Sequence, residues 1–161
     1  MSRHVFTVGE ANSLVPTLTQ TFQQIDAHKY QIREATKKIE VLDLLWGNAV
    51  RDPSNADHKD YMAHRETVDR ALRGIQRSIQ EGVIAHGLRL PLGGIEEGLV
   101  DFPTTYQGRW VYLCWHMGER EIQYWHETDT GFQGRQEITA AQRDEMGRDD
   151  PADLDDSELD F

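Results

Sequence analysis

The sequence predicts an α+β protein, in which a long antiparallel helical hairpin is followed by a small three-stranded antiparallel β-meander. Apolar residues recur at helical spacing in two long stretches before residue 87 and alternate with polar residues after residue 98, and glycines and prolines interrupt the segment between. The length of 161 residues suits one domain, or one domain with an appendage. We expect a helical hairpin over 7–86, a sheet with a Gly-rich loop packed on it over 98–138, and an acidic disordered tail over 144–161.

The first helix is predicted to begin near Val8, because Thr7 followed by Glu10 forms a capping-box pattern. Pro16 then either kinks this helix or restarts it, since proline cannot donate to the helical ladder. Beyond Pro16, apolar residues at seven-residue spacing form a seam resembling that of a coiled coil. They are Leu18, Ile25, Ile32, Ile39 and Trp46.

A second helix is predicted from another apolar stripe, formed by Tyr61, Val68, Leu72, Ile75, Ile79 and Val83. The turn residues between the two stripes leave only a short connection, so the helices are expected to pack antiparallel. Both stripes indicate packing and not a cofactor site. His28 and His86 are interpreted as core or boundary residues because neither has a second ligand four residues away.

The predicted sheet has the strand 109–117 in its middle. Gln107-Gly108 and Gly118-Glu119 are interpreted as two-residue turns on either side of it. This register places Val100, Phe102 and Thr104, with Ile122, Tyr124 and His126, on the face of Val111, Leu113 and Trp115. Pro103 requires its strand to be an edge strand. The opposite face is so aromatic that the segment 129–136, a second copy of the chain or a ligand is expected to cover it.

Charge and composition argue against several classes of function. Of the net charge of −11, a net −8 comes from the nine acidic residues and one arginine between positions 144 and 161. Without a basic excess, nucleic-acid binding is not expected. Apolar runs are much shorter than the ~20 residues of a membrane span, and the first residues lack the features of a secretion signal. The single cysteine, Cys114, suits a reducing compartment, so the chain is expected to be cytoplasmic. It is expected to bind neither membrane nor nucleic acid.

An ordered cluster of motifs over residues 98–136, together with the opening segment, resembles a bacterial family known as domain of unknown function 2203. The motifs are Gly98–Pro103, Leu113–Trp115, Gly118–Glu119, Trp125–His126 and Gly131–Gln136, with Phe6–Asn12, Leu14 and Pro16 at the start. The resemblance spans residues 6 to 138 and implies no reaction, substrate or cofactor. It marks Asp101, Cys114, Glu119, Trp125, His126 and Arg135 as positions to test.

Asp101, Glu119 and His126 could together hold a divalent metal, since carboxylates and imidazole are common ligands of such ions. The predicted register argues against this set, because it places Asp101 and His126 on opposite faces unless a bulge or a curled edge intervenes. Cys114 could act as a nucleophile with His116 as its base. A buried structural role for Cys114 is favoured.

Asp101 and Arg135 are predicted to form an ion pair that closes the Gly131–Gly134 loop over the aromatic face. Alternatively, Arg135 and the amides of that loop hold an anionic ligand. The candidate ligand-binding residues are therefore Asp101, Glu119, His126 and Arg135.

The favoured interpretation of function is a non-enzymatic, self-associating interaction or regulatory protein that forms a homodimer. The long apolar seam and the surplus aromatic face motivate it. The alternative is a protein that binds a small ligand or a divalent metal between the sheet and the Gly-rich loop, and this alternative includes an enzyme. The sequence identifies neither a cofactor nor a reaction.

Overall fold

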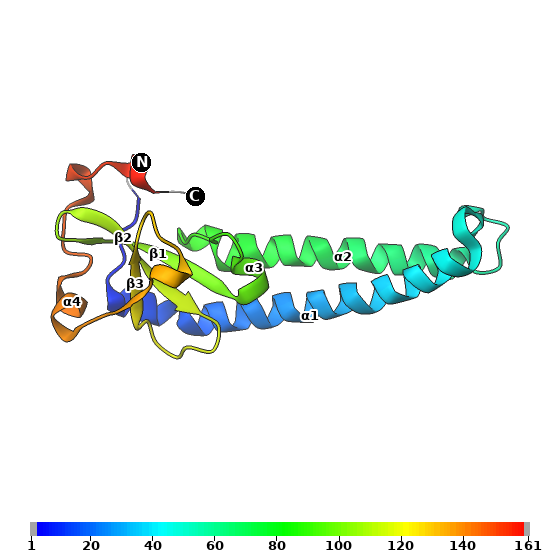
Figure 1. The fold of residues 1–161 in the computed structure, drawn as a ribbon, viewed down its shortest axis with the longest axis horizontal. Coiled ribbons are helices and arrows are strands. Elements are labelled where there is room, and N and C mark those ends of the chain that lie inside the picture. Colours follow the sequence, from blue (N-terminus) through cyan, green and yellow to red (C-terminus); the bar gives the residue numbers. More distant parts are fainter. Residues whose placement is uncertain (1–2, 160–161) are drawn as a thin grey trace. The chain divides into compact units, whose positions relative to one another are not determined.

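The computed structural model describes residues 3–159, and it has the predicted α+β architecture (Figure 1). Two long helices, α1 (Val8–Trp46) and α2 (His58–Gly82), come first. They are followed by α3 (Gly94–Glu97), β1 (Leu99–Tyr106), β2 (Arg109–His116), β3 (Tyr124–Glu127), β4 (Gln136–Glu137) and α4 (Ala140–Glu145). Among the described residues, no helix combines the length and the apolar character needed to cross a membrane.

Contacts between residues divide the chain into two compact units. The hairpin unit consists of residues 23–79, and the sheet unit consists of residues 3–22 and 80–159 of the described chain. The first residues of α1 therefore belong with the strands. The domain boundaries expected from sequence, 7–86 for the hairpin and 98–138 for the sheet with its loop, stay predictions.

Helix α1 begins where its capping box predicts. The backbone N–H of Glu10 donates to Thr7 Oγ1 at 3.1 Å, and the N–H of Thr7 donates to Glu10 Oε1 at 3.4 Å. These two bonds satisfy donors that the first helical turn leaves free. Pro16 lies inside the helix and does not end it.

In the hairpin unit, α1 and α2 are in direct contact. Ser78 Oγ donates to Gln24 Oε1 at 3.4 Å, and a Cβ atom at Gly74 would lie 2.5 Å from the ring of His28. Glycine at position 74 thus lets α2 approach the His28 ring, which confirms a packing role for this histidine. The seven-residue seam does not stay buried to its end, since Trp46 is 40% exposed. These contacts support a helical hairpin. They do not support the coiled coil that the seven-residue spacing resembles.

The four strands form one antiparallel sheet in the order β1-β2-β3-β4. The turn between β1 and β2 is the predicted one, with positive φ angles at Gln107 (51°) and Gly108 (75°), as in a two-residue turn of the primed type. The predicted register of β1 on β2 is confirmed, because Val100 pairs with Trp115 and Phe102 with Leu113. The short strand β4 adds a fourth strand to the three that were predicted.

The register predicted between β2 and β3 is wrong by one residue. His126 pairs with Tyr112 and Trp125 with Leu113, so Trp125 and not His126 lies on the face of Val111. A shift of one residue moves every side chain of a strand to the other face. The shift arises because β3 begins only at Tyr124, after an irregular segment over 117–123.

The two faces of the sheet pack against different parts of the sheet unit. On the face of Val100, the start of α1 supplies Phe22, whose ring lies 5.7 Å from that of Trp115. On the opposite, aromatic face, Phe132 lies 5.5 Å from the ring of His116, and the Arg135 guanidinium lies 3.8 Å from the ring centre of Tyr124. The segment 129–136 thus contributes the cover that the aromatic face was expected to need.

The outer edge of β1 is protected by three segments that are distant in sequence. Phe6 N–H donates to the Pro103 carbonyl oxygen at 3.0 Å, and Gly147 N–H donates to that of Thr105 at 2.9 Å. Arg89 and Asp101 exchange two backbone hydrogen bonds of 2.9 Å. Pro103 lies on an edge strand, as predicted, and its missing N–H would have faced away from β2.

The start of the acidic tail, predicted at residue 144, lies too early. Met146 is fully buried, and Asp149 Oδ2 accepts a hydrogen bond of 3.0 Å from the N–H of Gly108. Residues 146–149 therefore pack against the sheet, although most of their neighbours in sequence are acidic. Disorder beyond residue 150 stays a prediction.

Two truncations test where the docked segment ends. Removing residues 150–161 should change the melting temperature by less than about 2 °C. Removing residues 145–161 should lower it by roughly 4–10 °C, because loss of a buried methionine costs about 2 kcal/mol or more and each kcal/mol is worth about 2–4 °C at this size. Calorimetry of both truncations and of full-length Met146→Ala provides the comparison. Equal melting temperatures for the two truncations would contradict a docked Met146.

Candidate functional site

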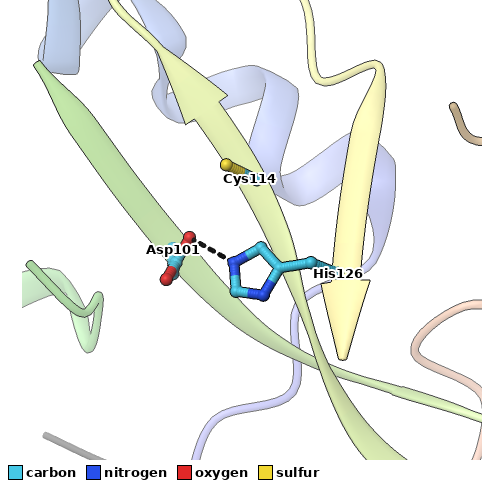
Figure 2. A group of neighbouring side chains, drawn as sticks. All are labelled: Asp101, Cys114 and His126. Atoms are coloured by element: carbon cyan, nitrogen blue, oxygen red, sulfur yellow. Dashed lines mark hydrogen bonds and ion pairs between the residues drawn. The ribbon is translucent and has the colours of Figure 1, made fainter. Parts of the chain in front are cut away.

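Three neighbouring strands bring Asp101, Cys114 and His126 together on the aromatic face (Figure 2). Asp101 lies on β1 directly opposite Cys114 on β2, and His126 comes from β3. Each of the three residues is 1% exposed. One potential ligand atom from each side chain lies within 4.8 Å of the other two.

Asp101 is the residue that the other polar groups contact. Its Oδ2 accepts a hydrogen bond of 3.0 Å from Arg89 Nη1, and its Oδ1 lies 3.0 Å from His126 Nε2. Arg89 is positioned by its backbone bridge to Asp101, and its guanidinium lies 4.8 Å from the ring centre of Tyr112. The buried carboxylate is thereby paired on both oxygens, as a buried charge requires.

The hydrogen bonds of His126 determine where its protons lie. Nδ1 is 2.7 Å from the carbonyl oxygen of Glu127, and because a carbonyl oxygen only accepts, Nδ1 carries a proton. Nε2 then faces the Asp101 carboxyl group, a contact that requires either a proton or a metal ion between the two atoms. Burial disfavours the charged ring, but the hydrogen bond to Asp101 and its negative charge outweigh burial and raise the pKa of His126.

Cys114 is a protonated thiol at neutral pH in this environment. Burial, and after it the negative charge of Asp101, raise the pKa of Cys114 to about 12. An unassisted thiolate nucleophile is therefore not supported, and His116, the base considered from the sequence, contacts Phe132. A metal cation at the position of the thiol proton would reverse this preference, because metals bind cysteine as thiolate.

The cluster forms one wall of a pocket of about 130 Å³. The other walls are largely apolar, and the segment just before β4 contributes to them. Its lining residues are Arg89, Pro91, Leu92, Leu99, Asp101, Cys114, His126, Thr130, Gly131 and Phe132.

Glu119 and Arg135 form a separate ion pair. Arg135 Nη2 donates to both carboxylate oxygens of Glu119, at 2.9 and 2.7 Å, and Glu119 Oε1 also accepts from the backbone N–H of His116 at 2.6 Å. The predicted latch between Asp101 and Arg135 is therefore wrong. Asp101 is already paired with Arg89 and His126, and Arg135 fastens the loop through Glu119.

A family model described as "Uncharacterized conserved protein (DUF2203)" matches residues 4–138. The chain belongs to the DUF2203 family. This confirms the resemblance seen in the sequence, and the matched range includes every residue of the cluster and of the Glu119–Arg135 pair. No curated protein and no solved structure shows significant similarity to this DUF2203 chain.

The structure of this DUF2203 chain groups other residues than the metal set considered from the sequence. Asp101 and His126 do lie together, but Cys114 takes the third place and Glu119 belongs to the pair with Arg135. Sequence reasoning missed Arg89 because it lies in the segment between the helices and the sheet that glycines and prolines interrupt. The alternation Leu88-Arg89-Leu90 was the available signal for a short piece of extended chain beside the sheet.

A double-mutant cycle tests the assignment of Arg135 to Glu119. Glu119→Gln and Arg135→Gln should each lower the free energy of unfolding by about 1–3 kcal/mol, because each leaves a largely buried partner unpaired. The double variant should cost less than the sum by about 1 kcal/mol or more, since the two side chains are in contact. Urea denaturation measures both quantities.

The exposed pair Glu66 and Arg70, whose nearest charged atoms are 3.1 Å apart, is the matched control. Its coupling should not exceed about 0.5 kcal/mol. Strictly additive losses at Glu119 and Arg135 would contradict the assignment.

Proposed function

We propose that this protein binds a divalent transition-metal ion of the zinc class through Asp101, Cys114 and His126. The observation that carries the proposal is the convergence of a carboxylate, a thiol and an imidazole within 4.8 Å, in a buried cluster at the wall of a pocket. Of the two functions considered from the sequence, this geometry favours metal or small-ligand binding over self-association alone.

The spacing of the three ligand atoms suits tetrahedral coordination. Zinc bonds of about 2.0–2.3 Å place neighbouring ligand atoms roughly 3.3–3.8 Å apart. In the structure, Asp101 Oδ1 and His126 Nε2 are 3.0 Å apart, and no two of the three ligand atoms are more than 4.8 Å apart. The ligand–ligand distance of a zinc site lies between these two values. Small side-chain rotations would therefore be enough to close the site.

The outer contacts of the cluster also match those of a metal centre. Histidines that bind metal usually donate their second ring N–H to a carbonyl or carboxylate, as His126 Nδ1 does to Glu127. Arg89 holds the Asp101 oxygen that faces away from His126, which would fix the carboxylate for binding through one oxygen. A zinc ion would displace the proton of Cys114 and the Nε2 proton of His126, and the Asp101 and Cys114 anions would balance its charge.

Metal binding by the untagged protein tests the proposal. We expect one zinc or cobalt ion per chain, with a thiolate-to-cobalt absorption band and a dissociation constant measured by competition with a chromophoric chelator. Cys114→Ser and His126→Gln should each weaken metal binding by about 100-fold or more. Loss of a residue that only hydrogen-bonds a metal ligand costs ~10–100-fold, so this larger loss identifies a direct ligand. Cys114→Ser should also abolish the absorption band.

His116→Gln is the matched control, because His116 lies on the same strand outside the cluster and should leave metal affinity unchanged. Circular dichroism establishes that each variant is folded. Substoichiometric binding by the folded wild-type protein, or wild-type affinity in Cys114→Ser, would refute the proposal.

Self-association remains a second candidate, supported by an apolar surface of the hairpin unit. Val41, Leu44 and Leu45 near the end of α1 are more than 60% exposed, and Leu44 is 91% exposed. A neighbouring groove of about 340 Å³ is lined by charged residues of both signs, including Lys37 and Asp60. A surface that carries both signs can pair with a second copy of itself about a two-fold axis.

Light scattering tests this second candidate. The chain should form a dimer at tens of micromolar, as expected for contacts worth about 8 kcal/mol, and Leu44→Asp should make it monomeric. Leu92→Asp, at a fully exposed leucine of the sheet unit, should remain dimeric. A wild-type protein that is monomeric at 100 µM would exclude the interaction.

A further inference from the structure

We infer that residues 129–135 form a lid over the candidate metal site, and that the Glu119–Arg135 pair holds this lid closed and so sets the rate of metal exchange. This inference rests on the proposed metal site and adds its regulation. The lid connects β3 to β4, and Thr130 and Phe132 of the lid line the same pocket as the three candidate ligands. A movement of the lid would therefore widen the approach to the metal position.

The structure leaves a metal ion little access to its ligands while the lid is in place. Asp101, Cys114 and His126 are each only 1% exposed. Their own strands cannot move apart easily, because β2 pairs with β1 along its whole length and with β3 on its other side. Since a metal site needs an entry path, some other wall of the pocket has to yield.

The lid is the wall of the pocket that is held least firmly through its backbone. Among the described residues, the backbone hydrogen bonds of the lid stay within it or reach Glu127 just before it. Gly134 N–H donates to the carbonyl oxygen of Gly131 at 2.9 Å, and Thr130 N–H donates to that of Glu127 at 3.2 Å. Residues 129–133 are all exposed. Segments with exposed backbone and few tertiary contacts open at a low cost in free energy.

Two side chains fasten the lid to the rest of the sheet unit. Arg135 Nη2 donates to both carboxylate oxygens of Glu119, and its guanidinium lies 3.8 Å from the ring centre of Tyr124. The ring of Phe132 lies 5.5 Å from that of His116. Arg135 is the stronger fastening, because it combines a charge-assisted hydrogen bond with a cation–π contact. Its loss should raise the population of the open lid.

A lid that does not bind the metal changes rates and leaves affinity unchanged. None of the three candidate ligands belongs to the lid. If the ion enters and leaves through the open state, a larger open population speeds both steps by the same factor, and the dissociation constant, their ratio, stays constant. Loss of a metal ligand differs, since it weakens affinity.

Stopped-flow kinetics of the full-length protein with cobalt test the inference. The rise of the thiolate-to-cobalt band measures entry, and its decay in excess chelator, at several chelator concentrations, measures release. Arg135→Gln should speed both steps about tenfold, the effect of about 1.4 kcal/mol. The dissociation constant should change by less than about twofold. Arg135→Lys should fall between this variant and wild type, because it keeps the charge but loses the planar fork.

A second variant strains the lid without removing the ion pair. A Cβ atom at Gly134 would lie 2.6 Å from Thr130 Cβ and 2.7 Å from Thr130 Oγ1. Gly134→Ala should therefore destabilise the closed lid and speed entry and release by equal factors. Gly131→Ala is the matched control, because a Cβ atom there has no neighbour within 4 Å, and it should keep both rates within about twofold of wild type.

The outcomes separate the two proposals. If cobalt binds with a thiolate band but enters and leaves folded Arg135→Gln and Gly134→Ala at wild-type rates, the lid is overturned and the metal site stands. Weaker affinity with an unchanged rate of entry in these variants would also overturn the lid, because it would show that they act on the ligands themselves. A wild-type protein that takes up no cobalt would overturn both proposals.

Discussion

The position of His126 depends on how the segment 117–123 is held between β2 and β3. The backbone N–H of Ile122 donates to Asn12 Oδ1 on α1 at 2.6 Å, and Trp115 Nε1 donates to the carbonyl oxygen of Glu119 at 2.9 Å. These bonds hold the segment outside the ladder between β2 and β3, and β3 starts at Tyr124. The resulting register places His126 on the same face as Asp101 and Cys114. Without it, neither the contact between Asp101 and His126 nor the candidate metal site would exist.

Asp101 connects this register to the rest of the sheet unit. Its backbone joins the segment around Arg89 to the edge of β1, and its side chain joins Arg89 to His126. Asp101 therefore protects a strand edge through its backbone and organises the buried charges through its carboxylate. In the metal-free protein Cys114 is a neutral thiol, and although burial lowers the pKa of His126, the hydrogen bond to Asp101 outweighs burial and raises it. A bound cation would replace the thiol proton of Cys114 and the Nε2 proton of His126.

Glu119 and Arg135 pair with each other, whereas the sequence suggested Asp101 as the partner of Arg135 and considered Glu119 as a metal ligand. The arginine lies between the rings of Tyr124 and Phe132, 3.8 and 4.9 Å from their centres. Stacking and the two-oxygen contact with Glu119 both favour arginine over lysine at this position. The pair holds the segment that covers the aromatic face, and Phe132 and Gly131 of that segment line the pocket. Its effect on the pocket is thus one of position, since it does not belong to the candidate ligand set.

Local patterns in the sequence determined much of this fold. The capping box at Thr7 and Glu10, the two apolar stripes and the Gln107-Gly108 turn act over a few residues, and each formed the element that it predicted. The pairing of Asp101 with Cys114 followed from that turn. The tertiary structure decided the register of β3, the partner of Arg135, the role of Arg89 and the burial of Met146. These features depend on contacts between distant residues, such as the bond between Asn12 and Ile122, which are 110 positions apart, and no local pattern encodes which distant group will satisfy a given donor or charge.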